Sequence, residues 1–266
     1  MNFELRDISC GYDAKDPIVK NLNLSLRNGD VCCILGPNGV GKTTLFRTAL
    51  NLLKPIRGRV LVNGEDISTW DAKKVAAHIA YVAQAHTPSF PYLVREVAMM
   101  GRLGKIPAYS KPDENDYKIV ERALEDVGIG HLRDIPYSRI SGGERQLLMI
   151  ARALSQQPEM LVMDEPTASL DYGNMVRVMQ TIRKLAEKGM IIVFTSHMPD
   201  QAFMCHATTV LLLRNNPAIV GYCSDVITEN NLWEAYHAEI QILEVVGSGN
   251  EAIKVVVPRL TPVSEE

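Results

Sequence analysis

VCCILGPNGVGKTT, residues 31–44, is the stretch that decides the fold of this chain. Its first five residues are apolar and predict a buried strand, and residues 36–44 satisfy G-x-x-x-x-G-K-[ST], a loop that opens a helix. Glycine lets such a loop adopt positive φ angles and approach phosphate oxygens, and the helix N-terminus presents unpaired N–H groups with partial positive charge. The stretch therefore predicts a nucleotide phosphate site between a strand and a helix.

The side chains of this loop have separate predicted tasks. Lys42 is placed to reach the β- and γ-phosphates, Thr43 to offer its hydroxyl to Mg²⁺, and Thr44 to donate to the phosphates. The residues that we expect to contact the nucleotide are Gly36, Pro37, Asn38, Gly39, Val40, Gly41, Lys42, Thr43 and Thr44. A loop of this type serves kinases, GTPases, motors and transport ATPases alike, so other residues must distinguish among these classes.

Two acidic residues end an apolar stretch in EMLVMDEP, residues 159–166. Four consecutive apolar residues are typical of a buried strand in a parallel sheet, and Asp164 and Glu165 then lie at its carboxyl end, where ligand sites form. Alone, such a pair is more often a solvated strand end, but the phosphate loop upstream favours a site. We predict that Asp164 holds Mg²⁺ through water and that Glu165 polarises the attacking water.

Strand-like and helical stretches alternate along the chain. Residues 1 to about 84 are strand-rich with one helical stretch, and residues 87 to about 157 look helical throughout. Beyond them, strand and helix alternate again. This order predicts an α/β fold with a mostly parallel sheet flanked by helices.

Composition excludes several classes of protein. The chain has 266 residues, 46% of them apolar and 22% charged, which suffices for a core without disulfides or structural metal. Lys and Arg number 28 against 31 for Asp and Glu, and the net charge of −3 argues against nucleic acid as a partner. Apolar runs reach five residues at most, against the roughly 20 that cross a bilayer. We expect any membrane role to be exercised through another subunit.

The cysteines and the N-terminus predict a reducing cytoplasm. MNFELRDISCGYD carries acids where a secretion signal needs an apolar stretch. The cysteines are an odd number without a CxxC spacing, so we expect thiols and neither disulfides nor a zinc site. They are Cys10, Cys32, Cys33, Cys205 and Cys223.

A third motif, ISGGERQ at residues 140–146, precedes a helical stretch for which Ser141 is a natural N-cap. By itself it is equally well a capped helix with a glycine pair. However, it stands 23 residues before Asp164, and His197 follows another apolar stretch, GMIIVFTS. With these motifs in this order, the sequence resembles the ATP-binding cassette (ABC) family, specifically the nucleotide-binding subunit of a transporter. The resemblance covers about 230 of the 266 residues.

The resemblance implies roles for residues outside the phosphate loop. Tyr12 matches the aromatic residue that stacks on adenine, and Gln84 matches the glutamine that contacts Mg²⁺ and relays the nucleotide state to the membrane subunit. His197 matches the histidine that touches the γ-phosphate, and with Glu165 and Lys42 completes the expected catalytic set.

The resemblance also implies a homodimer. The signature closes over the γ-phosphate bound by the opposite subunit, and here it is Ser141, Gly142, Gly143 and Glu144. Ser169, Leu170 and Asp171 match a loop that crosses the dimer interface. Ile140 replaces the usual leucine and Glu144 the usual glutamine. The first swap conserves volume and the second occurs in importers of this type, so we expect activity.

In fold, the resemblance implies a P-loop NTPase core of the ABC type. An ATP-binding domain spans residues 1–243, with an N-terminal antiparallel β subdomain and a helical subdomain inserted at about 87–157. Residues 244–266 are expected to form a last strand and a polar tail.

The helical segment and a later motif resemble particular classes of importer. SFPYLVREVAMMGRL, DYKIVERALEDVGI and the later LWEAYHAEIQI resemble importers of metal chelates: ferric siderophores, haem and cobalamin. Importers of molybdate and tungstate look almost as similar. Either reading implies an integral membrane permease, an extracytoplasmic binding protein and a peripheral position at the cytoplasmic face of the membrane.

Two other classes of protein fit the sequence less well. ABC ATPases of DNA repair insert a long coiled coil between loop and signature, whereas here about 100 residues without sustained heptads separate them. A non-catalytic binding module is opposed by the intact Asp164–Glu165 pair.

Overall fold

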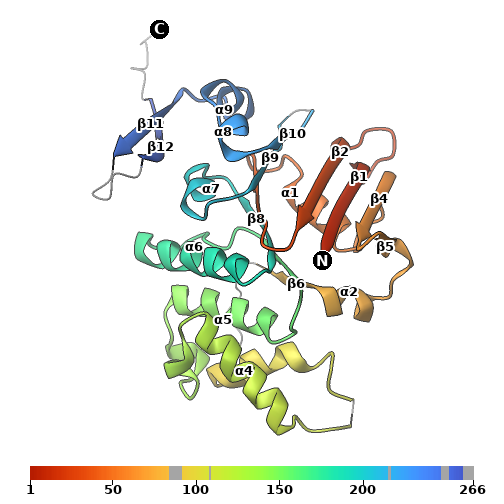
Figure 1. The fold of residues 1–266 in the computed structure, drawn as a ribbon, viewed down its shortest axis with the longest axis vertical. Helices are drawn as coiled ribbons and strands as arrows, with labels where there is room; N and C mark the ends of the chain where they lie inside the picture. Colours follow the sequence, from red (N-terminus) through yellow and green to blue (C-terminus); the bar gives the residue numbers. More distant parts are fainter. Residues whose placement is uncertain (84–91, 108, 215–216, 247–251, 260–266) are drawn as a thin grey trace.

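The computed structural model describes residues 1–83, 92–107, 109–214, 217–246 and 252–259, which are drawn in colour in Figure 1. Within these residues the chain forms two larger sheets, helices on both sides of the central one, and a C-terminal hairpin.

A six-stranded sheet forms the centre, in the order β10-β9-β3-β8-β7-β6, and all its pairings are parallel except that of β10 with β9. The predicted mostly parallel sheet is thus confirmed. Its register aligns Leu35 with Ser196 and Met163 with Phe194, so the predicted loop, acids and histidine leave neighbouring strand ends at one edge. The strands are β3 (Val31–Leu35), β6 (Ile79–Val82), β7 (Met160–Met163), β8 (Ile191–Ser196), β9 (Thr209–Leu212) and β10 (Ile219–Gly221).

The second sheet is antiparallel and N-terminal, in the order β2-β1-β4-β5, as the sequence predicted. Leu45 and Phe46 of α1 are buried together with side chains of this sheet and of the central one, so α1 packs between the two. The elements concerned are β1 (Asn2–Cys10), β2 (Val19–Arg27), β4 (Arg57–Val62), β5 (Glu65–Asp66) and α1 (Lys42–Ala49).

Helices cover the other face of the central sheet, and Figure 1 shows α4 and α5 stacked beneath α6, away from the N-terminal sheet. Helix α4 begins at Glu114, because the Asp113 side chain caps it by accepting from the Asp116 N–H. These and the remaining helices are α2 (Ala72–His78), α3 (Val94–Met99), α4 (Glu114–Asp126), α5 (Gly142–Leu154), α6 (Tyr172–Glu187), α7 (Asp200–Met204), α8 (Cys223–Val226) and α9 (Glu229–Tyr236). Short 3₁₀ turns are η1 (Ile67–Thr69), η2 (Met100–Arg102), η3 (Gly130–Leu132) and η4 (Tyr137–Arg139).

Alternation along the strands divides the core into two layers. Cys33 of β3 faces the layer under the helices and Cys32 the layer that contains α1. The predicted thiols are confirmed, since all five cysteines are free. Burial raises the pKa of Cys33 well above its usual range, so this thiol stays protonated and inert.

The C-terminal segment differs from its prediction. The strand expected after residue 244 is β12 (Ala252–Pro258), but it pairs as an antiparallel hairpin with a further strand, β11 (Ile240–Val246), which the sequence did not indicate. AIKVVVP is rich in β-branched residues, and β11 gives its backbone a partner. The expected polar tail lies outside the described residues. Among the described residues, the helices are all too short or too polar to span a bilayer.

Candidate nucleotide site

The loop after β3 has the backbone that the motif predicted. Gly36 and Gly41 have φ angles of 151° and 111°. A Cβ at Gly36 would lie 2.7 Å from the Leu213 carbonyl oxygen, and one at Gly41 would lie 2.5 Å from a methyl of Ile18. Both positions therefore require glycine for space as well as for conformation.

The loop and the acidic pair share one pocket of about 290 Å³. Its lining joins residues some 120 positions apart in the chain, which the strand register has brought to one edge. The lining residues are Asn38, Gly39, Gly41, Lys42, Thr43, Thr44, Asp164 and Glu165. Of the loop residues expected to contact nucleotide, Gly36, Pro37 and Val40 lie outside this lining.

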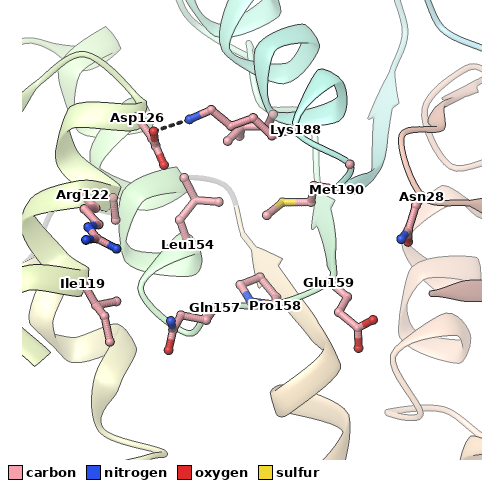
Figure 2. Close-up of a pocket in the computed structure, with 13 residues that line it drawn as sticks. Asn28, Ile119, Arg122, Asp126, Leu154, Gln157, Pro158, Glu159, Lys188 and Met190 are labelled. Carbon is pink, nitrogen blue, oxygen red and sulfur yellow. Dashed lines mark hydrogen bonds and ion pairs between the residues drawn. The ribbon is translucent and has the colours of Figure 1, made fainter. Parts of the chain in front are cut away.

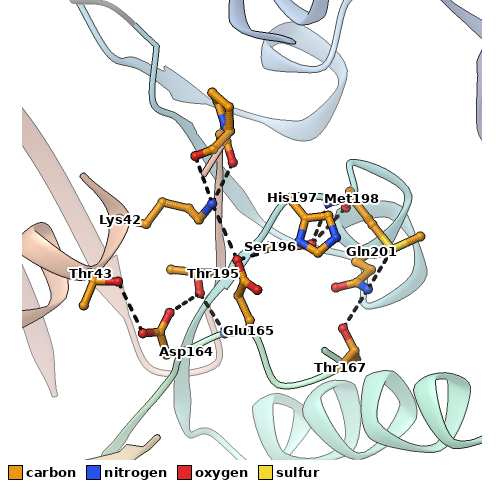
Figure 3. Close-up of polar contacts among 12 residues, drawn as sticks. Lys42, Thr43, Asp164, Glu165, Thr167, Thr195, Ser196, His197, Met198 and Gln201 are labelled. Carbon is orange, nitrogen blue, oxygen red and sulfur yellow. Dashed lines mark hydrogen bonds and ion pairs between the residues drawn. The ribbon is translucent and has the colours of Figure 1, made fainter. Parts of the chain in front are cut away.

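Lys42 is buried against its own loop. Its Nζ donates to the carbonyls of Gly36 at 2.7 Å and Pro37 at 3.2 Å, and lies 3.6 Å from Glu165 Oε1 (Figure 3). Burial lowers the pKa of Lys42, and the adjacent Glu165 opposes that shift. The lysine is thus ion-paired, and it is held at the edge of the pocket by carbonyls that a phosphate can replace.

Thr195 fixes the two acids relative to each other. Its hydroxyl donates to Asp164 Oδ1 at 2.7 Å and accepts from the Glu165 N–H at 2.8 Å (Figure 3). Thr195 is not among the site residues predicted from the sequence. The signal was present, because Thr195 stands two residues before His197 at the end of the neighbouring parallel strand.

Thr43 and Asp164 face each other, with 3.5 Å between Thr43 Oγ1 and Asp164 Oδ2. The hydroxyl and the carboxylate are hard oxygen donors, as a magnesium ion prefers. Gln84, the third predicted magnesium residue, lies outside the described residues.

His197 lies beside the predicted base. Its Nδ1 is 3.7 Å from Glu165 Oε1, and about half of its side chain, 51%, is exposed. Glu165 has a φ of 44°, in the left-handed region. The structure thus places both Lys42 and His197 beside the Glu165 carboxylate (Figure 3), although His197 is not among the residues that line the pocket.

Tyr12 lies outside the pocket lining and is 67% exposed. Its phenol oxygen accepts a hydrogen bond of 2.9 Å from Nη1 of Arg47, on α1. A ring held in the open beside the helix that bears Thr43 is available to stack on a base.

The signature residues form the start of α5. Ser141 Oγ accepts from the Glu144 N–H at 3.3 Å, and Glu144 accepts from the Ser141 N–H at 2.7 Å, a reciprocal cap. A Cβ at Gly143 would lie 2.1 Å from the Asn174 side chain, so only glycine fits. Gly142 completes this stretch, and all four residues are absent from the lining of the phosphate pocket of their own chain.

The loop of residues 169–171 runs directly into α6, which Asp171 caps by accepting from the Asn174 N–H at 2.8 Å. Ser169 has a φ of 63°. Upstream of this loop, the Thr167 hydroxyl accepts a hydrogen bond of 2.7 Å from Gln201 in α7.

Another crevice, of about 340 Å³, lies at the opposite ends of the strands (Figure 2). Its floor is apolar, with Leu154, Pro158 and Met190, and an ion pair of Lys188 with Asp126 crosses its rim. Clusters of metal-ligating side chains were not found there or elsewhere in the described part of the chain. The crevice lies between α4, the C-terminal end of α6 and the residues that precede β7 and β8, and its lining residues form no catalytic grouping.

Comparison with known proteins places these features in context. The model of the ABC transporter family matches residues 19–168. The chain is 33% identical to the molybdate import ATP-binding protein MolC of Haemophilus influenzae, over 85% of this chain and 84% of that one. It is also 33% identical to the hemin import ATP-binding protein HmuV of Hahella chejuensis, over 85% and 89%. A solved structure described as a metal-chelate type ABC transporter in an inward-facing conformation superposes with a TM-score of 0.87 at 29% identity, covering 98% of this chain and 99% of that chain.

Proposed function

Since this chain belongs to the ABC transporter family and is the ATPase subunit of an importer, we propose that it powers the uptake of a metal chelate, such as a ferric siderophore, haem or cobalamin. In this proposal it binds peripherally at the cytoplasmic face of the membrane to an integral permease, which receives the chelate from an extracytoplasmic binding protein. The likeness to HmuV and to the metal-chelate type structure supports this cargo class.

One observation carries the ATPase chemistry. Lys42, Asp164 and Glu165 line one pocket, and Thr195 holds both acids by hydrogen bonds of 2.7 and 2.8 Å. The edge of the sheet therefore holds three groups in place: Lys42 as a cation for the phosphates, Asp164 as a ligand for a metal ion, and Glu165 as a base for water. Phosphoryl transfer needs mainly such positioning and electrostatic stabilisation.

The donor set suits Mg²⁺. Thr43 and Asp164 supply a hydroxyl and a carboxylate oxygen, and we assign Gln84 to the same ion on the resemblance alone. When bound, Mg²⁺ neutralises charge on the β- and γ-phosphates.

The chain's own residues divide the remaining tasks. Lys42 exchanges its loop carbonyls for phosphate oxygens, and Glu165 accepts the proton of the water that attacks the γ-phosphorus. His197, beside Glu165, donates to a γ-phosphate oxygen and holds that oxygen in place. Tyr12 stacks on the adenine.

The signature implies that catalysis needs two subunits. Residues 141–144 do not line their own phosphate pocket, yet they present a capped helix N-terminus at which Gly143 has no room for a side chain. Such an N-terminus attracts an anion. We propose that it closes over the γ-phosphate bound by a second copy, so that a head-to-tail homodimer encloses two ATP molecules.

A second candidate function is import of molybdate or tungstate, favoured by the 33% identity to MolC. The ATP site serves both functions equally, because permease and binding protein select the cargo. Uptake into vesicles that contain the subunit and its permease distinguishes them, with radiolabelled ferric chelate compared with molybdate. A less favoured third candidate, an ABC ATPase outside transport, predicts no stimulation by a permease.

Glu165→Gln tests the hydrolytic mechanism. The amide cannot accept the proton but keeps every phosphate contact, so we expect Mg-ATP binding at least as tight as wild type. Hydrolysis should fall by on the order of 10², a barrier increase near 3 kcal/mol. The variant should accumulate as an ATP-bound dimer in size-exclusion chromatography run beside a phosphate-release assay.

Glu187→Gln is the matched control, because Glu187 is exposed on α6 and paired with Arg183. It should hydrolyse ATP like wild type. Wild-type turnover by Glu165→Gln would show that Glu165 is not the base.

A further inference from the structure

The C-terminal hairpin has two chemically different faces. Residues paired across β11 and β12 share a face, and the register pairs Leu243 with Val255 and Val245 with Ile253. We define the outer face as Gln241, Leu243, Val245, Ile253, Val255 and Val257. The inner face includes Ile240, Ile242 and Val256, which pack against the core.

The outer face is uncharged and, apart from Gln241, apolar, and several of its apolar side chains are exposed. Leu243, Val245 and Ile253 are 46%, 50% and 53% exposed. The hairpin's charged pair, Glu244 and Lys254, lies on the inner face, with 3.8 Å between the charged atoms. A contiguous exposed apolar surface marks an interaction site, and a two-stranded sheet gains stability from being covered on both sides.

The hairpin is attached firmly to the fold. The Val256 N–H donates to Asp200 Oδ1 at 2.8 Å, and the Ile242 N–H donates to Glu229 Oε1 at 3.0 Å. These acids begin α7 and α9, so the hairpin is anchored to both helices (Figure 1).

Helix α7, to which β12 is hydrogen-bonded, lies near residues expected at the interface between two copies. α7 begins three residues after His197, and its Gln201 is bonded to Thr167, two residues before Ser169. In the proposed head-to-tail dimer, the loop of residues 169–171 crosses between the subunits. The bond from the Val256 N–H to Asp200 therefore places β12 beside a helix that begins three residues after His197.

We propose that the outer face of the hairpin packs against the outer face of the same hairpin in a second copy of this chain. A twofold interface brings a patch against itself, and an uncharged patch does so without like-charge repulsion. The inference rests on the proposed dimer and adds a contact independent of ATP. It keeps the two subunits associated after the nucleotide has left.

Charge on the outer face tests the proposal. Val245→Lys and Ile253→Lys in the full chain should weaken dimerisation by on the order of tenfold, because each would bury a charged ammonium group in an apolar contact. Sedimentation equilibrium with the Glu165→Gln background and ATP, and with wild type without nucleotide, measures the effect. Val220→Lys is the matched control, since Val220 is a similarly exposed valine on β10, 37% exposed.

Cross-linking provides a second test, which does not rely on a loss of dimerisation. Leu243→Cys should form a covalent dimer under mild oxidation without ATP, and Val220→Cys should not. Far-UV circular dichroism and ATP binding verify that each variant is folded.

The outcomes separate this inference from the proposed function. If Glu165→Gln dimerises with ATP while the lysine variants dimerise equally well and Leu243→Cys stays monomeric, the hairpin contact is wrong and the ATPase proposal stands. If Glu165→Gln neither binds ATP nor dimerises, the proposed function fails and this inference with it. Flotation of wild type with phosphatidylglycerol–phosphatidylcholine vesicles, lost in Ile253→Lys, would overturn the inference in favour of lipid.

Discussion

The phenol of Tyr12 accepts a hydrogen bond from Arg47, which lies one helical turn beyond Thr43 on α1. If Tyr12 stacks on adenine, this bond orients the ring before the nucleotide arrives. Tyr12→Phe keeps the ring and removes the acceptor, and Arg47→Leu removes the donor. We expect each to weaken Mg-ATP binding by about threefold, the scale of one solvent-accessible hydrogen bond.

Isothermal titration calorimetry of the two single variants and the double variant tests this. The double variant should bind as weakly as either single one, because both remove the same bond. Additive losses would mean that Arg47 does not act through Tyr12. Tyr12→Ala, which removes the ring, should lose considerably more affinity.

The site residues that belong to sequence motifs were predicted, whereas Thr195, which hydrogen-bonds to two of them, was not. Lys42, Thr43, Asp164 and Glu165 follow from local spacing, because their chemistry depends on neighbours in the chain. Thr195 depends on the alignment of β7 with β8, in which Met163 lies beside Phe194. Strand register is a property of the sheet, so local spacing does not reveal it.

Helices η2 and α5 approach each other closely at Gly101, where there is no space for a side chain. A Cβ at Gly101 would lie 2.0 Å from the Arg152 carbonyl oxygen and 3.0 Å from Ser155 Cβ. Gly101→Ala must therefore push η2 away from α5. We expect a loss of about 1–3 kcal/mol in the free energy of unfolding, as for other overpacked sites.

Urea denaturation followed by circular dichroism measures this loss. Gly104→Ala is the control, because a Cβ at Gly104 meets nothing within 4 Å. Its stability should stay within about 0.5 kcal/mol of wild type. Equal stability of the two variants would show that α5 can move away from η2 with no loss in the free energy of unfolding.

Strands with a continuous apolar pattern were predicted well. Strands that form only because a partner strand pairs with them were predicted less well. β3 and β7 read as apolar runs because the sheet buries both of their faces. The first strand of the hairpin was not predicted, because LWEAYHAEIQI reads as one continuous segment. In the structure α9 ends at Tyr236, and His237 takes a left-handed conformation that frees Ile240–Val246 to pair.

For the molecule as a whole, the separation of the signature from its own phosphate pocket leads to a complementation prediction. Lys42→Ala removes the phosphate cation and Ser141→Arg obstructs the signature, so either variant alone should be inactive. A mixed dimer of the two has one site with both defects and one with neither. Random mixing should therefore restore up to about a quarter of wild-type ATPase activity.

Phosphate release from the mixture, at several total concentrations, tests this. Wild-type activity per subunit should rise steeply with concentration when the permease is absent. Absence of recovery on mixing, or wild-type turnover independent of concentration, would contradict the two-subunit site. A mixture of Lys42→Ala with itself at double concentration is the control.

The contacts of Lys42 also affect how well small anions compete with nucleotide for the loop. Inorganic phosphate and sulfate that reach the vacant loop meet a lysine already bonded to the Gly36 and Pro37 carbonyls and facing Glu165. A small anion must break those bonds in return for few new ones, whereas a nucleotide brings a base, a sugar and three phosphates together. Background salts are thereby kept from occupying the subunit, and the availability of the pump does not follow the cell's phosphate supply.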